Sequence, residues 1–153
     1  MKKHLLFFCS LSIIGVAGQK YYAKISNAKV NPERKEVALN FAKAYLEKCE
    51  KKDYTPFQDF NITGRVQYSL NQNFEKSCQQ INENLGKIEI KNLEAAYLQK
   101  YTKDLDPIDL MVFTMTSEKV QKPLFVNVWI YHDKNFISGI NFSERNYSID
   151  VKK

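Results

Sequence analysis

The chain has 153 residues, of which 44% are hydrophobic and 26% are charged, and its mean hydropathy is −0.45. Its 23 Lys and Arg residues outnumber 17 Asp and Glu residues, which gives a formal net charge of +6 at pH 7. This length fits one domain with its own core. The basic residues are mixed with acidic ones instead of clustering, so we exclude a nucleic-acid-binding protein.

The first eighteen residues predict a secretory signal peptide. A basic start at Lys2–Lys3 precedes an apolar run at Leu5–Val16, and the small residues Ala17–Gly18 come just before the expected cleavage site. The apolar run is too short for a membrane-spanning helix. We therefore expect residues 1–18 to be removed and the mature chain to be exported, to the periplasm or the extracellular space, with no membrane span. A buried N-terminal element is the alternative interpretation.

A helix is predicted over Pro32–Lys51. Residues 19–30 before it are polar and show no clear period, so a polar tether and an opening strand are both open interpretations. Asn31 can cap the helix, and Pro32 suits its first position. Apolar residues recur at every fourth position: Val37, Phe41, Tyr45 and Cys49. The charges within residues 43–51 alternate in sign, which is typical of a solvated helix face.

A turn at Asp53–Pro56 is expected to end this helix. Three aromatic residues around this turn are expected to plug the core: Tyr54, Phe57 and Phe60. A second apolar stripe with helical spacing follows: Val66, Leu70, Phe74, Cys78, Ile81 and Leu85. Gly86 is well placed to end this second helix.

Cys49 and Cys78 both fall on the inward stripes of their predicted helices. Packing of the two helices would bring the thiols together, and an oxidising compartment would then favour a disulfide between them. Two separate buried thiols are the alternative. The sequence has no Cys-x-x-Cys pair, so redox chemistry has no support.

From Lys87 onward the pattern changes to strands joined by short turns. Residues 87–103 combine alternating isoleucines with helix-favouring residues, so both a strand and a helix are open interpretations. We predict a long strand, either bulged or straight. Three further strands are predicted: Leu110–Val120, Leu124–Tyr131 and Phe136–Phe142. Four aspartates are assigned to the turns: Asp104, Asp106, Asp109 and Asp133. Residues 144–153 are predicted to form a polar tail.

Helices followed by consecutive antiparallel strands define an α+β fold, with residues 31–143 forming a single domain. We expect the N-terminal helices to pack on a curved antiparallel sheet of about four strands. The sheet should curl around the first helix because one of its faces must bury both apolar stripes, and the result is a cone-like shape.

Three local strings accompany this order of elements: Ala42-Lys43-Ala44-Tyr45-Leu46-Glu47, then Lys52-Asp53-Tyr54, then Leu85-Gly86-Lys87. With them, residues 31–143 resemble the nuclear transport factor 2-like (cystatin-like) α+β superfamily, especially its secreted bacterial members of unknown function. The resemblance implies a pocket between the helix and the curved sheet. Relatives in that superfamily include isomerases, dehydratases, binding modules and toxin-neutralising proteins, so the fold alone does not select a function.

No catalytic residue, metal ligand or cofactor is assigned from the sequence. His132, the histidine that remains after cleavage, is predicted to be solvated in a turn beside Asp133. One histidine and two dispersed cysteines do not supply the three or four converging ligands of a metal site. The inward helix stripes carry no acid or histidine that burial could tune into a general base.

Trp129 shares one face of its predicted strand with Phe125, Asn127 and Tyr131, and the other face is also apolar. A strand that is apolar on both faces is covered on both sides. Three interpretations are open for the face that carries Trp129: contact with a second subunit in a homodimer through the sheet, the lining of a ligand pocket, or plain core packing. The residues assigned to the pocket are Tyr45, Phe113, Asn127, Trp129 and Tyr131.

The expected function is non-covalent binding of a small ligand or a protein partner outside the cytoplasm. The alternatives are a pocket enzyme of the isomerase or dehydratase type and an envelope interaction protein that blocks a toxin. A buried, isolated carboxylate inside the cone would favour the enzyme, and an interior without one would favour binding.

Overall fold

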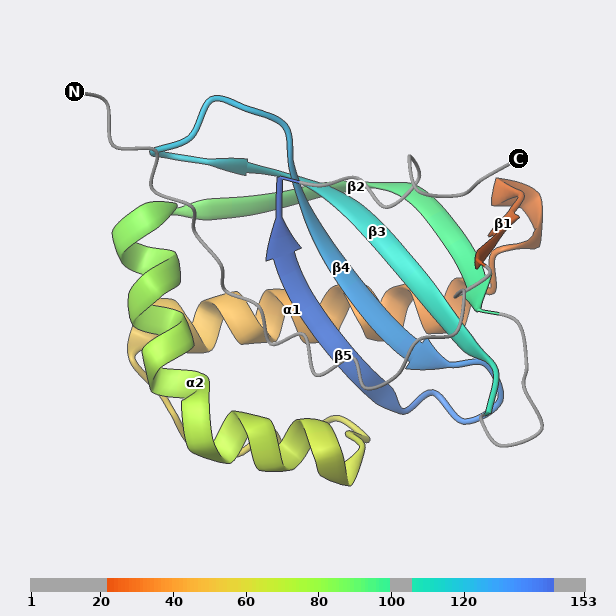
Figure 1. Ribbon diagram of the computed structural model, residues 1–153, viewed down its shortest axis with the longest axis horizontal. Coiled ribbons are helices and arrows are strands. Elements are labelled where there is room, and N and C mark those ends of the chain that lie inside the picture. Colours follow the sequence, from red (N-terminus) through yellow and green to blue (C-terminus); the bar gives the residue numbers. More distant parts are fainter. Residues whose placement is uncertain (1–21, 100–105, 145–153) are drawn as a thin grey trace.

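The computed structural model describes residues 22–99 and 106–144, and it has the predicted α+β architecture (Figure 1). The two helices are α1 (Pro32–Lys51) and α2 (Gly64–Asn84), and a short 3-10 turn (Asn27–Lys29) precedes them. The strands are β1 (Tyr22–Ile25), β2 (Ile88–Gln99), β3 (Ile108–Ser117), β4 (Leu124–Tyr131) and β5 (Ile137–Ser143). They form one antiparallel sheet in the order β1-β2-β3-β4-β5, and α1 runs across one face of it.

Helix α1 has the predicted bounds, and its ends follow from local chemistry. The Oδ1 atom of Asn31 accepts a 2.9 Å hydrogen bond from the backbone N–H of Arg34, and Pro32 occupies the first helical position. At the other end Lys52 adopts a left-handed conformation with φ 54° and donates its N–H to the Cys49 carbonyl at 3.3 Å.

The sheet has five strands where the sequence predicts about four. The additional strand, β1, lies in the segment 19–30, for which a tether and a strand were both open. Strand β2 confirms the strand interpretation of residues 88–99, and its register with β3 shifts between Ile90 and Ala95. Residues 100–103 lie outside the described residues.

Strand β3 begins at Ile108, two residues before the predicted start, so the assignment of Asp109 to a turn is wrong. The side chain of Asp109 is 1% exposed. The backbone of β3 extends this far because Ile108 and Asp109 pair with Tyr131 and Ile130 of β4.

The main core lies between the helices and the sheet. It contains the predicted stripe of α1 and the predicted stripe of α2 from Leu70 onward, whereas Val66 is half-buried outside it. The aromatic plug is confirmed too, since Phe57 is buried and both Tyr54 and Phe60 pack against this core. The opposite face of the sheet carries a second, smaller cluster: Ala95, Tyr97, Leu110, Val112 and Phe125, with Tyr22 and Trp129 packed against it.

The expectations for residues 1–18, for Asp104 and for most of the polar tail fall outside the described residues. Within residues 22–99 and 106–144, neither helix combines the length and the apolar character needed to cross a membrane.

Candidate functional site

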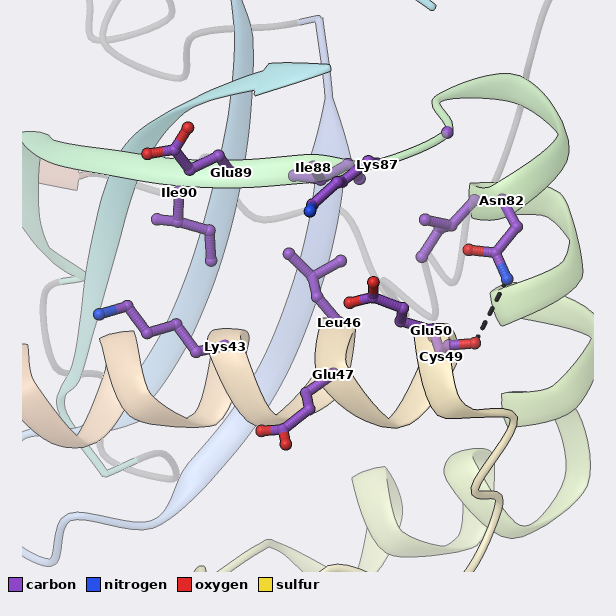
Figure 2. Close-up of a pocket in the computed structure, with 12 residues that line it drawn as sticks. Lys43, Leu46, Glu47, Cys49, Glu50, Asn82, Lys87, Ile88, Glu89 and Ile90 are labelled. Atoms are coloured by element: carbon purple, nitrogen blue, oxygen red, sulfur yellow. Dashed lines mark hydrogen bonds between the residues drawn. The ribbon is translucent and has the colours of Figure 1, made fainter. Parts of the chain in front are cut away.

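A cleft of about 570 Å³ separates the second half of α1 from the first residues of β2 (Figure 2). Helix α1 contributes one wall, β2 the opposite wall, and the end of α2 closes one end. We call this site the α1–β2 cleft. Its lining residues are Lys43, Leu46, Glu47, Cys49, Glu50, Ile81, Asn82, Gly86, Lys87, Ile88, Glu89 and Ile90.

The floor of the cleft is apolar. Ile81 is buried, whereas Leu46, Ile88 and Ile90 are half-buried at the edge of the main core. In Figure 2, Leu46 points from α1 toward β2, and Ile90 points back toward α1. A volume of this size lies within the range typical of ligand sites, and an apolar floor with polar groups around it is their usual construction.

The rim of the cleft carries charges of both signs. Glu47 forms an ion pair with Lys51, and Glu89 forms one with Lys91. In Figure 2, Glu89 points from β2 away from α1. The hydrogen bond and charge of Lys51 hold the pKa of Glu47 below its ordinary value, and Glu47 in turn raises the pKa of Lys51. Among the described residues, Lys43, Glu50 and Lys87 form no ion pair. These three charges are therefore available to a ligand.

The outer edge of β2 beside the cleft lacks a strand partner among the described residues. Strand β1 has four residues and pairs with β2 from Ala96 to Gln99, which leaves the outer edge of residues 88–95 uncovered by the described strands. An edge of this kind presents backbone N–H and C=O groups to whatever lies beside it. The register shifts after Ile90 interrupt the ladder with β3 and confine the regular part of the edge to residues 88–90.

The end wall of the cleft is fixed by the β3–β4 turn. Lys119 donates from Nζ to the Asn82 and Glu83 carbonyls at 3.0 and 2.9 Å, and Ser117 Oγ donates to the Leu85 carbonyl. These donors satisfy carbonyls that the last turn of α2 leaves unpaired. Gly86 then turns the chain into β2 with φ +65°, a conformation that favours glycine.

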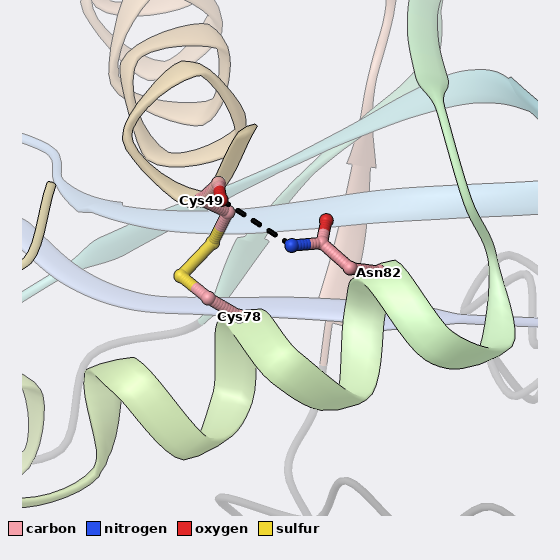
Figure 3. The surroundings of a disulfide bond; sticks show 3 residues. All are labelled: Cys49, Cys78 and Asn82. Carbon is pink, nitrogen blue, oxygen red and sulfur yellow. Dashed lines mark hydrogen bonds between the residues drawn. A yellow bond between two sulfur atoms is a disulfide. The ribbon is translucent and has the colours of Figure 1, made fainter. Parts of the chain in front are cut away.

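A disulfide between Cys49 and Cys78 joins the end of α1 to α2 beside the cleft, as the sequence predicts (Figure 3). The Asn82 amide adds a second link, since it donates to the Cys49 carbonyl at 3.3 Å. The two links fix α2 against the helix that forms the cleft wall. A disulfide is compatible with an exported protein.

The five residues assigned to a pocket from the sequence do not gather at one site: Tyr45 belongs to α1, and the other four belong to β3 and β4. Tyr45 and Phe113 belong to the main core, and Tyr45 also lines a smaller cavity beside α2. Asn127 and Trp129 lie on the opposite face, where Trp129 Nε1 donates to Tyr22 Oη at 3.0 Å. Tyr131 ends β4. Of the five, Tyr45 lines the smaller cavity, and none lines the α1–β2 cleft.

A buried charge network lies at the start of α1, and the sequence analysis missed it. Oδ2 of Asp109 accepts a 2.7 Å hydrogen bond from Arg34 Nε, and its Oδ1 is 2.8 Å from Nδ1 of His132. His132 lies in the turn after β4 as expected, but its side chain is 39% exposed and bonded, not simply solvated. Asp109 is therefore buried but not isolated, and it lines neither the α1–β2 cleft nor the smaller cavity beside α2.

The described residues contain no group of three or more His, Cys, Asp or Glu side chains that could hold a metal ion. The chain matches no protein-family model, no curated protein and no solved structure. The function is therefore argued from the site itself.

Proposed function

We propose that this domain binds an extended segment of a partner protein, non-covalently and outside the cytoplasm, in the α1–β2 cleft. One observation carries the proposal: a cleft of about 570 Å³ has an unpaired strand edge along one wall. An extended peptide that joins such an edge gains main-chain hydrogen bonds, and pockets for its alternate side chains give specificity.

The side chains of the cleft fit such a segment. Alternate residues of an added strand would point toward the floor formed by Leu46, Ile88 and Ile90. The unpaired charges on the rim, Lys43, Lys87 and Glu50, would complement a segment that carries both acidic and basic side chains. The short regular edge favours a contact of a few residues, which suits a short linear segment more than a folded domain.

The charge network at the start of α1 favours binding over the alternative of an isomerase or dehydratase. A general base needs a carboxylate or imidazole that can reach a substrate. Asp109 is the buried carboxylate among the described residues, and both of its oxygens are hydrogen-bonded, to Arg34 and His132. The His132 imidazole is 39% exposed but lines neither the α1–β2 cleft nor the smaller cavity beside α2. A partner in the cell envelope, including a toxin, would be one source of the segment. The homodimer through the sheet stays a separate prediction.

A phage-displayed library of random dodecapeptides selected on the immobilised protein tests this proposal. We expect enriched peptides to alternate apolar and charged residues and to bind the Ile90→Lys variant at least about tenfold more weakly, because a lysine would occupy the floor. Tyr68→Lys is the matched control, since Tyr68 is 70% exposed on α2 and does not line the cleft. Equal binding to the Ile90→Lys variant, with circular dichroism showing a folded protein, would contradict the proposal, as would the absence of enriched peptides.

A further inference from the structure

Three segments of the sequence have the pattern Asn-x-Ser/Thr without a proline in the middle: Asn61-Ile62-Thr63, Asn141-Phe142-Ser143 and Asn146-Tyr147-Ser148. In an exported protein this triplet is an acceptor for N-linked glycosylation, provided that it lies on the surface. Such a short pattern also arises by chance, so the fold is needed to distinguish between the triplets. The third one lies outside the described residues.

Asn61 meets the structural requirement. It is exposed in the loop between α1 and α2, and its side-chain amide has no hydrogen-bond partner among the described residues. The residues on either side of it, Phe60 and Ile62, pack against the main core instead. An added Cβ on nearby Gly64 would meet no atom within 4 Å, so the space beside the triplet is open to a bulky group.

The hydroxyl of Thr63, the third residue of this triplet, is not used by the fold. Thr63 is the N-cap residue of α2, but its side chain makes no capping hydrogen bond. The loop is held through its backbone, since the Asn61 carbonyl accepts from the Ile137 N–H at 2.8 Å and the Thr63 N–H donates to the Ile137 carbonyl at 2.9 Å. A sugar added before folding would therefore leave the loop able to take this position.

Asn141 differs in each of these respects. It is half-buried within β5 and lies opposite Asn127 of β4. The hydroxyl of Ser143, the third residue of its triplet, already accepts a 3.2 Å hydrogen bond from Nδ2 of Asn127, which is fully buried. A sugar on Asn141 would have to occupy the same face of the sheet as these side chains, so the folded protein has no room for it.

An acidic side chain further distinguishes the two asparagines. Asp59, two positions before Asn61, is exposed, whereas Phe60 between them is half-buried, so Asp59 and Asn61 both lie on the outer side of the loop. Gly139 occupies the matching position before Asn141 and has no side chain to offer. A transferase that binds the loop can therefore form a charge-assisted hydrogen bond with Asp59 beside the acceptor.

We propose that Asn61 is an N-glycosylation site of the exported protein, with Asp59 as a recognition residue, and that Asn141 is not modified. The donor is an oligosaccharide linked to a lipid diphosphate. The Asn61 side-chain nitrogen bonds to the anomeric carbon of the sugar and gives up one proton, while the bond from that carbon to the diphosphate oxygen breaks and the lipid diphosphate leaves. The site rests on the export that the proposed function also assumes, and it does not line the α1–β2 cleft.

The test is mass spectrometry of tryptic peptides from the protein isolated from the envelope or the medium of its own organism. We expect the peptide of residues 53–65 to carry the added mass of sugar residues, which Asn61→Gln abolishes, and the peptide of residues 135–145 to carry none. Asp59→Ala should lower the modified fraction at least about fivefold, because a charge-assisted contact is lost. Gln58→Ala is the matched control, since Gln58 is also exposed in this loop, and it should leave the fraction unchanged.

A peptide of residues 53–65 found only at its unmodified mass would overturn the proposal. Sugar on Asn141, or an unchanged modified fraction in the Asp59→Ala variant, would overturn it too. Each of these results leaves peptide binding in the α1–β2 cleft unaffected. Detection of the peptide of residues 4–20 in the isolated protein would instead show that the leader is retained, and the export on which both proposals rest would fail.

Discussion

Arg34, near the start of α1, donates a 2.7 Å hydrogen bond from Nε to Oδ2 of Asp109, which is 1% exposed in β3. The same guanidinium reaches the backbone carbonyl of His132 through its Nη1 atom. A buried carboxylate is tolerated when its charge is paired and its oxygens are hydrogen-bonded. The pair therefore fastens the first turn of α1 to the sheet and to the turn after β4.

The Arg34→Met variant tests this fastening. Removing the guanidinium leaves the Asp109 charge buried with His132 as its partner, and we expect the free energy of unfolding to fall by about 3 kcal/mol. The double variant Arg34→Met with Asp109→Leu should recover most of that loss, because no unpaired charge stays in the core. Urea unfolding of both variants measures the two values. A single variant as stable as the wild type would show that the pair does not fasten the fold.

Gly86 and Gly64 give a matched pair of glycine substitutions. Gly86 has φ +65°, and an added Cβ would lie 2.8 Å from Glu118 Oε2, so Gly86→Ala should destabilise the fold by about 1–2 kcal/mol. Gly64 begins α2 with no atom within 4 Å of an added Cβ, so Gly64→Ala should be neutral or stabilising by up to about 1 kcal/mol. Thermal unfolding of the two variants compares their stabilities. Equal melting temperatures would refute the prediction that Gly86→Ala is the less stable variant.

The Cys49–Cys78 disulfide closes a loop with a sequence separation of 29. A link across about 30 residues restricts the unfolded chain, so we expect the Cys49→Ala/Cys78→Ala variant to lose about 3–4 kcal/mol of stability. Urea unfolding with and without reductant measures this loss of stability. Reductant should destabilise the wild type and leave the double variant unchanged; a wild type insensitive to reductant under unfolding conditions would contradict the account.

The contribution of Asp53, just after α1, to the stability of the fold is expected to depend on pH. Its carboxylate accepts hydrogen bonds from Lys48 Nζ at 2.7 Å and from Thr55, and these hold its pKa well below the ordinary value of 3.8. Because the folded-state pKa is depressed, the contribution to stability is present above the ordinary value and is lost as the pH falls through the folded-state pKa.

An NMR titration of the Asp53 carboxyl carbon measures this shift directly. We expect Thr55→Val to raise the Asp53 pKa toward its ordinary value, because the hydroxyl hydrogen bond is removed, whereas Thr55→Ser should keep it low. An unchanged pKa in the Thr55→Val variant would mean that the hydroxyl does not hold it down.

Elements with local signals could be predicted from the sequence. The start of α1 is encoded by Asn31 and Pro32, which act within one helical turn, and its predicted bounds match. Strand β4 also has its predicted bounds, because Leu124–Tyr131 is apolar except for Asn127 and is flanked by turns. The disulfide was predictable as one of two alternatives, since both cysteines lie on the apolar stripes that pack the helices together.

The buried charge and the cleft depend on contacts between distant segments, so they could not be predicted. An aspartate in a predicted turn is expected to face solvent until its partner Arg34, 75 positions away, is known to lie beside it. Lys43 and Glu50 were interpreted as part of a solvated helix face, and they are exposed. What makes that face a cleft is the short length of β1, with 4 residues against the 12 of β2.

Amide hydrogen exchange along β2, measured with and without a library-selected peptide, tests the central claim most directly. Backbone groups at the free edge should exchange quickly in the free protein and become protected when a peptide pairs with them. We predict that the peptide slows exchange within Ile88–Ala95 and that the Ile90→Lys variant needs at least about tenfold more peptide for the same protection. Unchanged exchange along Ile88–Ala95 at saturating peptide, or protection confined to another part of the molecule, would contradict a peptide site in the α1–β2 cleft.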